Sequence, residues 1–445
     1  MTGRITRRRL MQAGLVVAGA SAAAPALAGT ASAGPASSGT VSAGTATAPA
    51  ISLAPAPTLP WPAANDIVAA TKLPSFPDAT FDVTGAVYLK SNVDLHLDTG
   101  ATLKFSGDAS KFPTVLTRYE GIECMNRSPM IYAFGEHNIA LTGTGTLDAA
   151  GTSSWNKGSD RAYLESLIAK GVTDPGKRVV PGSGHTMRST FVEPYNCDTV
   201  LIQGVTLKNS MFWQLHPTLC RNVTVAGVST DPSTAHSNTD GCDPESSDHV
   251  VIRDCNLGAH DDNIAIKSGR DDDGRRFNVP TQNLVVFNCV MNGNWGAITC
   301  GSEQTGGIRN VYAYKCQVKG ATKFALYVKS NTRRGGFSQN INLDSFTGDF
   351  DRSFTFVTMT YNGQTGTHPP AFGPFTITNS SCTKAPLVFD VSGLSNDHVK
   401  GLIVKNCAFN GVANPTNKIT NVDGLSFTNV TINGKPVTHS KGATG

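Results

Sequence analysis

The segment His249-Val-Val-Ile-Arg-Asp-Cys-Asn-Leu257 carries the pattern that decides the fold. A polar residue opens the segment, apolar residues follow, and a polar turn precedes its last strand-like residues. Related units start at Asn138, Thr199, Asn222, Asn283, Asn310, Asn340, Phe375, Gly401 and Gly424. From Thr199 onward the starts are about 23 to 35 residues apart, which is typical of a repeat protein. Each unit has room for two or three short strands.

Long amphipathic helices between the units are missing, which excludes an alternating strand–helix fold, because its crossovers need roughly a dozen residues or more. The one helix-like stretch is 160–170, with Asp160 as its N-cap and Gly171 as its stop. A propeller would need a steady period of roughly 40 to 50 residues. We therefore expect an all-β protein, a single right-handed parallel β-helix (solenoid) that forms one domain over residues 58–438.

The composition favours a loop-rich, β-rich protein with many tight turns. The 445 residues include 45 glycines, and only 16% are charged. The net charge of +4 is compatible with a polyanionic partner but is too small to indicate nucleic-acid binding. We expect no nucleic-acid partner and a monomer.

The N-terminus is similar to a twin-arginine export signal. Thr6-Arg7-Arg8-Arg9-Leu10-Met11 precedes an apolar, alanine-rich stretch that ends at Ala28, with a further small-residue cleavage pattern ending at Ala33. We assign residues 1–33 to this signal and residues 34–57 to a low-complexity linker. No stretch reaches the roughly 20 apolar residues of a membrane span. The expected location is extracellular.

Ten cysteines in an exported chain permit disulfides, but the positions of several indicate another role. Cys255, Cys289, Cys316 and Cys407 occupy equivalent places in their repeats. Such residues can stack as small apolar groups inside a core. No pairing follows from the sequence, and the spacing fits no zinc site.

Two acidic clusters lie about one repeat apart. The first contains Asp240, and the second contains Asp261 and Asp262, followed by Lys267. Successive coils of a parallel β-helix are roughly 4.8 Å apart, so the three carboxylates are expected to meet. Mutual repulsion then raises at least one pKa, as a general acid requires. An aspartate in a turn is often only a cap, but two clusters one coil apart favour a site.

These segments resemble the polygalacturonase-type glycoside hydrolases, family 28, over nearly the whole mature chain. The motifs that carry the resemblance are SNVDLHLDTGATLKF from Ser91, RSTF from Arg188, LKNSMFWQLHP from Leu207, NTDG from Asn238, HDD from His260, GSE from Gly301 and KSNTRRGG from Lys329. The resemblance implies inverting hydrolysis of pectin-type polysaccharide. Asp261 would be the general acid, and Asp240 with Asp262 would activate water. Inversion typically requires roughly 6.5 to 9.5 Å between acid and base.

The resemblance also implies a substrate-binding set that differs from the family pattern. Lys329 matches the lysine of an R-I-K motif, which meets a substrate carboxylate. Trp295 and Tyr327 stand where the family has a histidine and an arginine, so they either stack on sugar rings or pack against the scaffold. The substrate-binding candidates are Asn238, Lys267, Trp295, Tyr327 and Lys329.

Neighbouring positions also depart from the family pattern, with His260 and Asn263 flanking the aspartate pair. The charged run 270–276 either meets substrate or forms a solvated turn, and it does not match a calcium loop. We expect no metal and no cofactor.

Three functions stay open. The first is polygalacturonase-like hydrolysis of galacturonosyl linkages. The second is hydrolysis of rhamnogalacturonan or another pectic oligosaccharide, since replacement of the family arginine weakens carboxylate recognition at one subsite. The third is a pectate lyase or a glycan-binding β-helix without turnover, against which the three aspartates argue.

Overall fold

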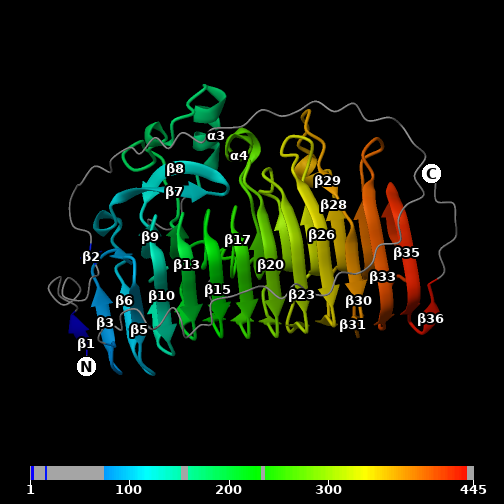
Figure 1. Cartoon of the computed structure of the whole chain (residues 1–445), viewed down its shortest axis with the longest axis horizontal. Helices are drawn as coiled ribbons and strands as arrows, with labels where there is room; N and C mark the ends of the chain where they lie inside the picture. Colours follow the sequence, from blue (N-terminus) through cyan, green and yellow to red (C-terminus); the bar gives the residue numbers. More distant parts are fainter. Residues whose placement is uncertain (1, 5–15, 18–74, 152–158, 232–235, 438–445) are drawn as a thin grey trace.

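Each repeat forms strands that hydrogen-bond to the same strands of the next repeat, always in parallel. The computed structural model describes residues 2–4, 16–17, 75–151, 159–231 and 236–437. Its coils stack side by side into the predicted right-handed parallel β-helix (Figure 1). The described coils run from Thr80 to Pro436, so residues 58–74 of the expected domain lie outside the described part. The same holds for the expected linker and for most of the expected signal.

The larger sheet contains two rows of strands. The first row is β5 (Val93–Leu97), β10 (His137–Gly143), β13 (Asp198–Gln203), β15 (Arg221–Ala226), β17 (Asp248–Arg253), β20 (Thr281–Phe287), β23 (Ile308–Tyr314), β26 (Phe337–Asp344), β30 (Phe375–Thr378), β33 (Val399–Phe409) and β35 (Val422–Ile432). The second row is β3 (Thr80–Val83), β6 (Thr102–Phe105), β11 (Thr146–Asp148), β14 (Thr206–Lys208), β16 (Ser229–Thr230), β18 (Asn256–Leu257), β21 (Val290–Met291), β24 (Gln317–Val318), β27 (Thr347–Gly348) and β31 (Ser381–Cys382). The sheet also includes β1 (Thr2–Arg4), β29 (Ala371–Phe372) and β36 (Lys435–Pro436).

A second wall closes each coil. Its strands are β2 (Val16–Val17), β4 (Val87–Tyr88), β9 (Ile131–Phe134), β12 (Val192–Tyr195), β19 (Ile264–Ile266), β22 (Gly296–Gly301), β25 (Phe324–Lys329), β28 (Ser353–Thr358), β32 (Leu387–Ser392) and β34 (Lys418–Thr420). Single bridges through Leu215 and Cys242 link β12 to β19, so the wall is continuous. We call it the second wall throughout.

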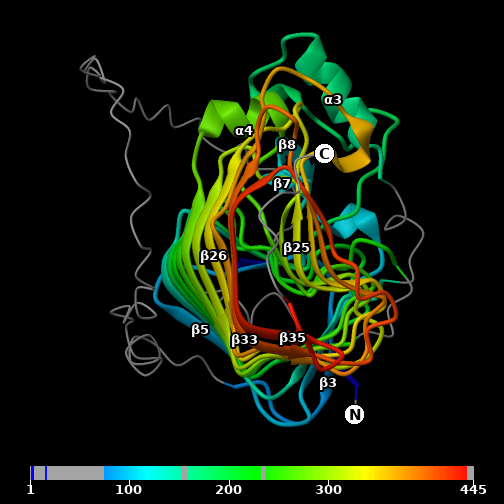
Figure 2. The same ribbon diagram turned by 90° about the vertical axis from the view of Figure 1, so that its right-hand side faces the viewer.

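Other elements project from one side of the coils. They are the hairpin β7 (Thr114–Tyr119) and β8 (Ile122–Arg127), the helices α3 (Arg161–Ala169) and α4 (Asp271–Phe277), and the 3-10 turns η1 (Ala109–Lys111), η3 (Pro175–Lys177) and η4 (Tyr361–Gly363). Seen along the coils, α3 and α4 lie at the same end of the outline, and the hairpin is labelled just below them (Figure 2). The expected helix at 160–170 is confirmed as α3. None of the described helices is long and apolar enough to cross a membrane.

Asparagines fix the sharp bends between strands. Asn283, Asn310 and Asn340 all have a φ between 54° and 58°, a left-handed conformation that asparagine tolerates because its short amide bonds locally. Asn310 Nδ2 donates to Asn283 Oδ1 at 3.1 Å, and Asn340 Nδ2 donates to Asn310 Oδ1 at 2.9 Å. This ladder holds the same bend in register from coil to coil.

The core between the walls is apolar and includes the cysteines. All ten are buried and free. Cys255, Cys289 and Cys316 occupy one position in successive coils. The backbone N–H that follows Cys289 donates to the carbonyl of Cys255, and the one that follows Cys316 donates to the carbonyl of Cys289. The interpretation of these thiols as small core residues is therefore confirmed.

Candidate active site

Two neighbouring coils place three aspartates side by side on the outside of the second wall. Cys242 and Ile264 are bridge partners, and Asp240 and Asp262 each precede a partner by two residues. The backbone N–H of Gly241 donates to the carbonyl of Asp262 at 3.0 Å. One carboxylate oxygen from each of Asp240, Asp261 and Asp262 lies within 4.8 Å of the others. The register of the strands thus creates the cluster.

The three aspartates differ in exposure. Asp240 is 2% exposed and Asp262 is 1% exposed, whereas Asp261 is partly open to solvent. Burial, with the charge of Asp262 next, raises the pKa of Asp261 to about 6. Burial and Asp261 also raise the pKa of Asp240 well above its usual range. At least one proton is therefore shared within the cluster near neutral pH, and only Asp261 presents it to the outside.

The carboxylates meet at about the spacing between strands. One oxygen of each lies within 4.8 Å of the others, because parallel stacking brings equivalent side chains together. The roughly 6.5 to 9.5 Å typical of inverting pairs is a separation between whole carboxyl groups. The oxygen distance therefore decides neither inversion nor retention.

Lys329 reaches the cluster from two coils away. Its Nζ lies 3.0 Å from Asp262 Oδ2, and the backbone N–H of Gly296 donates to Asp262 Oδ1 at 2.8 Å. Gly296 belongs to the intervening coil, and a Cβ there would lie 2.0 Å from Thr299 Oγ1 and 3.0 Å from Asp262 Oδ1. The missing side chain leaves room for Thr299 and for the Asp262 carboxylate that the Gly296 N–H binds.

Lys267 holds a second group of acids. Its Nζ lies 3.2 Å from Glu303, 3.6 Å from Asp240 and 3.7 Å from Asp243. Burial opposes its charge, but these three carboxylates raise the pKa of Lys267 above its usual value. Lys267 thus contacts protein carboxylates, and only 3% of it is exposed. Asp243 and Glu303 were not predicted as site residues, although Glu303 belongs to the quoted GSE motif and Asp243 follows the NTDG motif by two residues.

Asn238 links the cluster to a buried arginine. Its Nδ2 donates to Asp261 Oδ2 at 3.4 Å, while its Oδ1 accepts from Arg188 Nη2 at 2.9 Å. Arg188 also lies 4.8 Å over the ring of Phe212. The arrangement fixes which way the Asn238 amide faces, and through it the orientation of Asp261.

Trp295 and Tyr327, the two aromatic residues that differ from the family pattern, have different surroundings. Tyr327 is 3% exposed and packs against Phe324 and Phe356, with ring centroids 4.6 and 5.5 Å away. Trp295 is partly exposed, and its backbone N–H donates to the carbonyl of Asp261 at 3.2 Å. Trp295 is therefore the aromatic group that lies open beside the catalytic candidates.

Three carboxylates this close are also a geometry that oxygen-binding cations use. Here Lys329 lies against Asp262 and Lys267 lies near Asp240. These two ammonium groups supply the countercharge that an ion would bring. Two lysines of the chain itself therefore offset part of the negative charge of the cluster.

The charged run 270–276 is not a solvated turn. It forms α4, and Arg270, Asp271 and Asp273 are buried. Asp273 accepts from Arg178 at 2.7 Å and from the backbone of Glu123 at 2.8 Å. The interpretation as a solvated turn was wrong, because these charges fasten α4 to the β7–β8 hairpin, whereas contact of the run with substrate stays a prediction.

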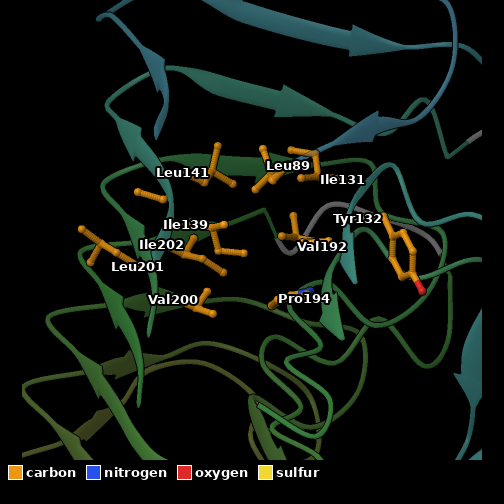
Figure 3. Close-up of a pocket in the computed structure, with 12 residues that line it drawn as sticks. Leu89, Ile131, Tyr132, Ile139, Leu141, Val192, Pro194, Val200, Leu201 and Ile202 are labelled. Atoms are coloured by element: carbon orange, nitrogen blue, oxygen red, sulfur yellow. The ribbon is translucent and has the colours of Figure 1, made fainter. Parts of the chain in front are cut away.

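A small apolar gap lies elsewhere, inside the N-terminal coils. It is lined by residues from both walls, among them Leu89, Ile139 and Val192 (Figure 3). Its walls offer few polar partners, so it suits neither water nor a sugar. It is a packing defect of the core rather than part of the site.

Comparison with known proteins agrees with this geometry. The sequence matches the glycosyl hydrolases family 28 over residues 80–347. The chain belongs to this family. An exopolygalacturonase from Thermotoga maritima is 32% identical, covers 80% of this chain and 84% of its own, and superposes with a TM-score of 0.73. Family 28 membership identifies the protein as a glycoside hydrolase.

Two curated family 28 relatives are more distant. A probable polygalacturonase from Vitis vinifera is 25% identical over 77% of this chain and 69% of its own length. An exo-poly-alpha-D-galacturonosidase from Dickeya chrysanthemi is 25% identical over 78% of this chain and 64% of its own. The matched family region contains all three aspartates, Lys267 and Lys329.

Proposed function

We propose that this protein hydrolyses pectic polysaccharide at a linkage beside a galacturonate residue. The observation that carries the proposal is the carboxylate cluster, in which Asp261 alone is open to a substrate while Asp240 and Asp262 are buried beside lysines. The names of the relatives support galacturonate as the sugar.

The residues divide the work by exposure and charge. Asp261 gives its proton to the leaving glycosidic oxygen as the bond to the anomeric carbon breaks. Asp240 and Asp262 accept a proton from the attacking water, whose oxygen bonds to the same carbon. The raised pKa of Asp240 alone would also allow it to act as the acid. Exposure assigns that role to Asp261, and Lys267 favours the ionised form of Asp240.

Inversion at the anomeric carbon is part of the proposal and rests on the family resemblance. Proton NMR of the first product resolves the two anomers before they interconvert. An inverted product supports the single displacement drawn above. A retained product would mean that the short carboxylate separation reflects a covalent intermediate.

The activity is tested by incubating the protein with polygalacturonan, rhamnogalacturonan and their oligomers, with products identified by mass. Hydrolysis adds one water for each bond cleaved, divided between the two products, and creates one new reducing end. Elimination by a lyase would instead give an absorbing conjugated double bond. The absence of any cleavage, together with binding, would favour the glycan-binding alternative.

A second candidate is cleavage beside a neutral sugar such as rhamnose. It is favoured by Tyr327, which replaces the family arginine and is buried among aromatic rings instead of offering a carboxylate fork. The comparison is kcat/KM on homogalacturonan and rhamnogalacturonan oligomers, for the wild type and for Trp295→His with Tyr327→Arg. A strong preference of the wild type for homogalacturonan, unimproved by the double change, would exclude this candidate.

We also infer that the protein acts outside the cytoplasm as a monomer. The basic N-terminal motif supports twin-arginine export. Replacing Arg8 and Arg9 with lysine should keep the protein in the cytoplasm, and light scattering of the purified protein reports its oligomeric state.

A further inference from the structure

The row of residues that contains Asp261 continues into two cations. The backbone N–H of Trp295 donates to the carbonyl of Asp261 at 3.2 Å, and that of Lys323 donates to Trp295 at 2.9 Å. The backbone N–H of Arg352 in turn donates to Lys323 at 3.2 Å. These residues therefore occupy one position on four successive coils, at the spacing of neighbouring strands.

Aromatic rings hold both cations against the surface. Lys323 Nζ lies 3.2 Å from the centroid of the Trp295 ring. The Arg352 guanidinium lies 5.7 Å from the ring of Phe324 and 5.6 Å from that of Phe356. Such cation–π contacts fix the direction of a flexible side chain without neutralising it.

Neither cation has a carboxylate partner among the ion pairs of the described residues. The nearby acid Asp351 lies 3.5 Å from Lys384, and Asp262 is held by Lys329. Asp261 lies one coil before Trp295, on the opposite side from Lys323. Burial and the charge of Arg352 lower the pKa of Lys323. Lys323 and Arg352 carry like charges that repel each other, so binding of an anion beside them would relieve this repulsion.

We propose that Lys323 and Arg352 form a subsite for the free carboxylates of an acidic polysaccharide, one and two coils beyond Trp295. The proposal rests on the pectic substrate inferred above and places recognition of the substrate's charge on the Trp295 side of Asp261. A 1,4-linked pyranose is about as long as the spacing between coils, so successive uronates meet successive cations. This subsite provides carboxylate recognition at some distance from the bond that is cut.

The test is binding to an inactive background, Asp261→Asn, measured by calorimetry with galacturonate oligomers. The variant carries Lys323→Gln and Arg352→Gln. Its control carries Lys208→Gln and Lys405→Gln, two exposed lysines on the larger sheet whose loss changes the net charge equally. Two exposed ion pairs predict roughly 2- to 30-fold weaker binding in the variant, with a shallower dependence on salt. The control should bind like its parent.

Esterified ligand separates the carboxylate from the rest of the sugar. Binding of the fully methyl-esterified oligomer should not distinguish the variant from the control. Equal binding of the free acid by both proteins would overturn the subsite, even if the wild type hydrolyses polygalacturonan. If the wild type cleaves no pectic substrate but the free acid still binds through these cations, the proposed function fails and the subsite stands.

Discussion

Replacing Asp261 with asparagine should lower hydrolysis of a sugar–sugar bond by roughly 10²- to 10⁴-fold, the usual contribution of a general acid. Asparagine keeps the size of the side chain, and its oxygen still accepts from the backbone N–H of Asp262, 3.0 Å away in the native protein. With the pKa of Asp261 raised to about 6, about a tenth of the molecules hold the proton at pH 7. At the ordinary value of about 3.9, fewer than about one in 500 would do so. Burial and the charge of Asp262 thus create the acid.

The assay compares two leaving groups. A galacturonate oligomer needs a proton on its departing oxygen, whereas an aryl galacturonide with an acidic phenol does not. The variant should lose roughly 10²- to 10⁴-fold on the oligomer and less than about tenfold on the aryl substrate. The wild-type rate on the oligomer should fall as pH rises above about 6, since Asp261 then loses its proton. The pH–rate profile of the variant should not show this decrease. Equal losses on both substrates, or near-normal turnover of the oligomer, would refute the role.

Two further substitutions test the surroundings of the cluster, and thiol labelling tests the core. Gly296→Ala places a methyl group 2.0 Å from Thr299 Oγ1 and 3.0 Å from Asp262 Oδ1, so Asp262 must shift and kcat should fall by about 10²-fold; an unchanged kcat would show that the coil adjusts. Lys267→Met leaves buried carboxylates without their cation and should cost about 3–5 kcal/mol of unfolding free energy in urea titrations; a loss below about 1 kcal/mol would mean that the acids simply take up protons. An aromatic disulfide reagent should find no reactive thiol in the native protein and ten after denaturation, and fewer than ten would indicate a disulfide.

The sequence predicted those features that depend on the repeat. Polar residues such as Asn283 and Asn310 open the units because the bend needs a left-handed residue, and this requirement leaves a periodic trace. The displacement of Asp240 from Asp262 by one coil was readable for the same reason. The register of a solenoid converts separation along the chain directly into position in space.

Features that depend on packing between separate segments left no such trace. The run at 270–276 reads as a charged turn because nothing local shows that Arg178 and Glu123 will bind Asp273. The burial of Tyr327 also depends on Phe356 in the next coil, and aromatic residues serve sugar stacking and core packing equally well.

The ion pair between Lys329 and Asp262 crosses an entire intervening coil, which limits how the protein can change in length. Duplication or deletion of one coil preserves the hydrogen bonding of a solenoid, so repeat number is a natural variable in evolution and in engineering. Between Asp262 and Lys329 a single added coil would separate the lysine from its aspartate by one further strand spacing. Coils after β28 carry no such tie to the cluster. The C-terminal coils are therefore the region where modules can be grafted or removed while the chemistry is kept.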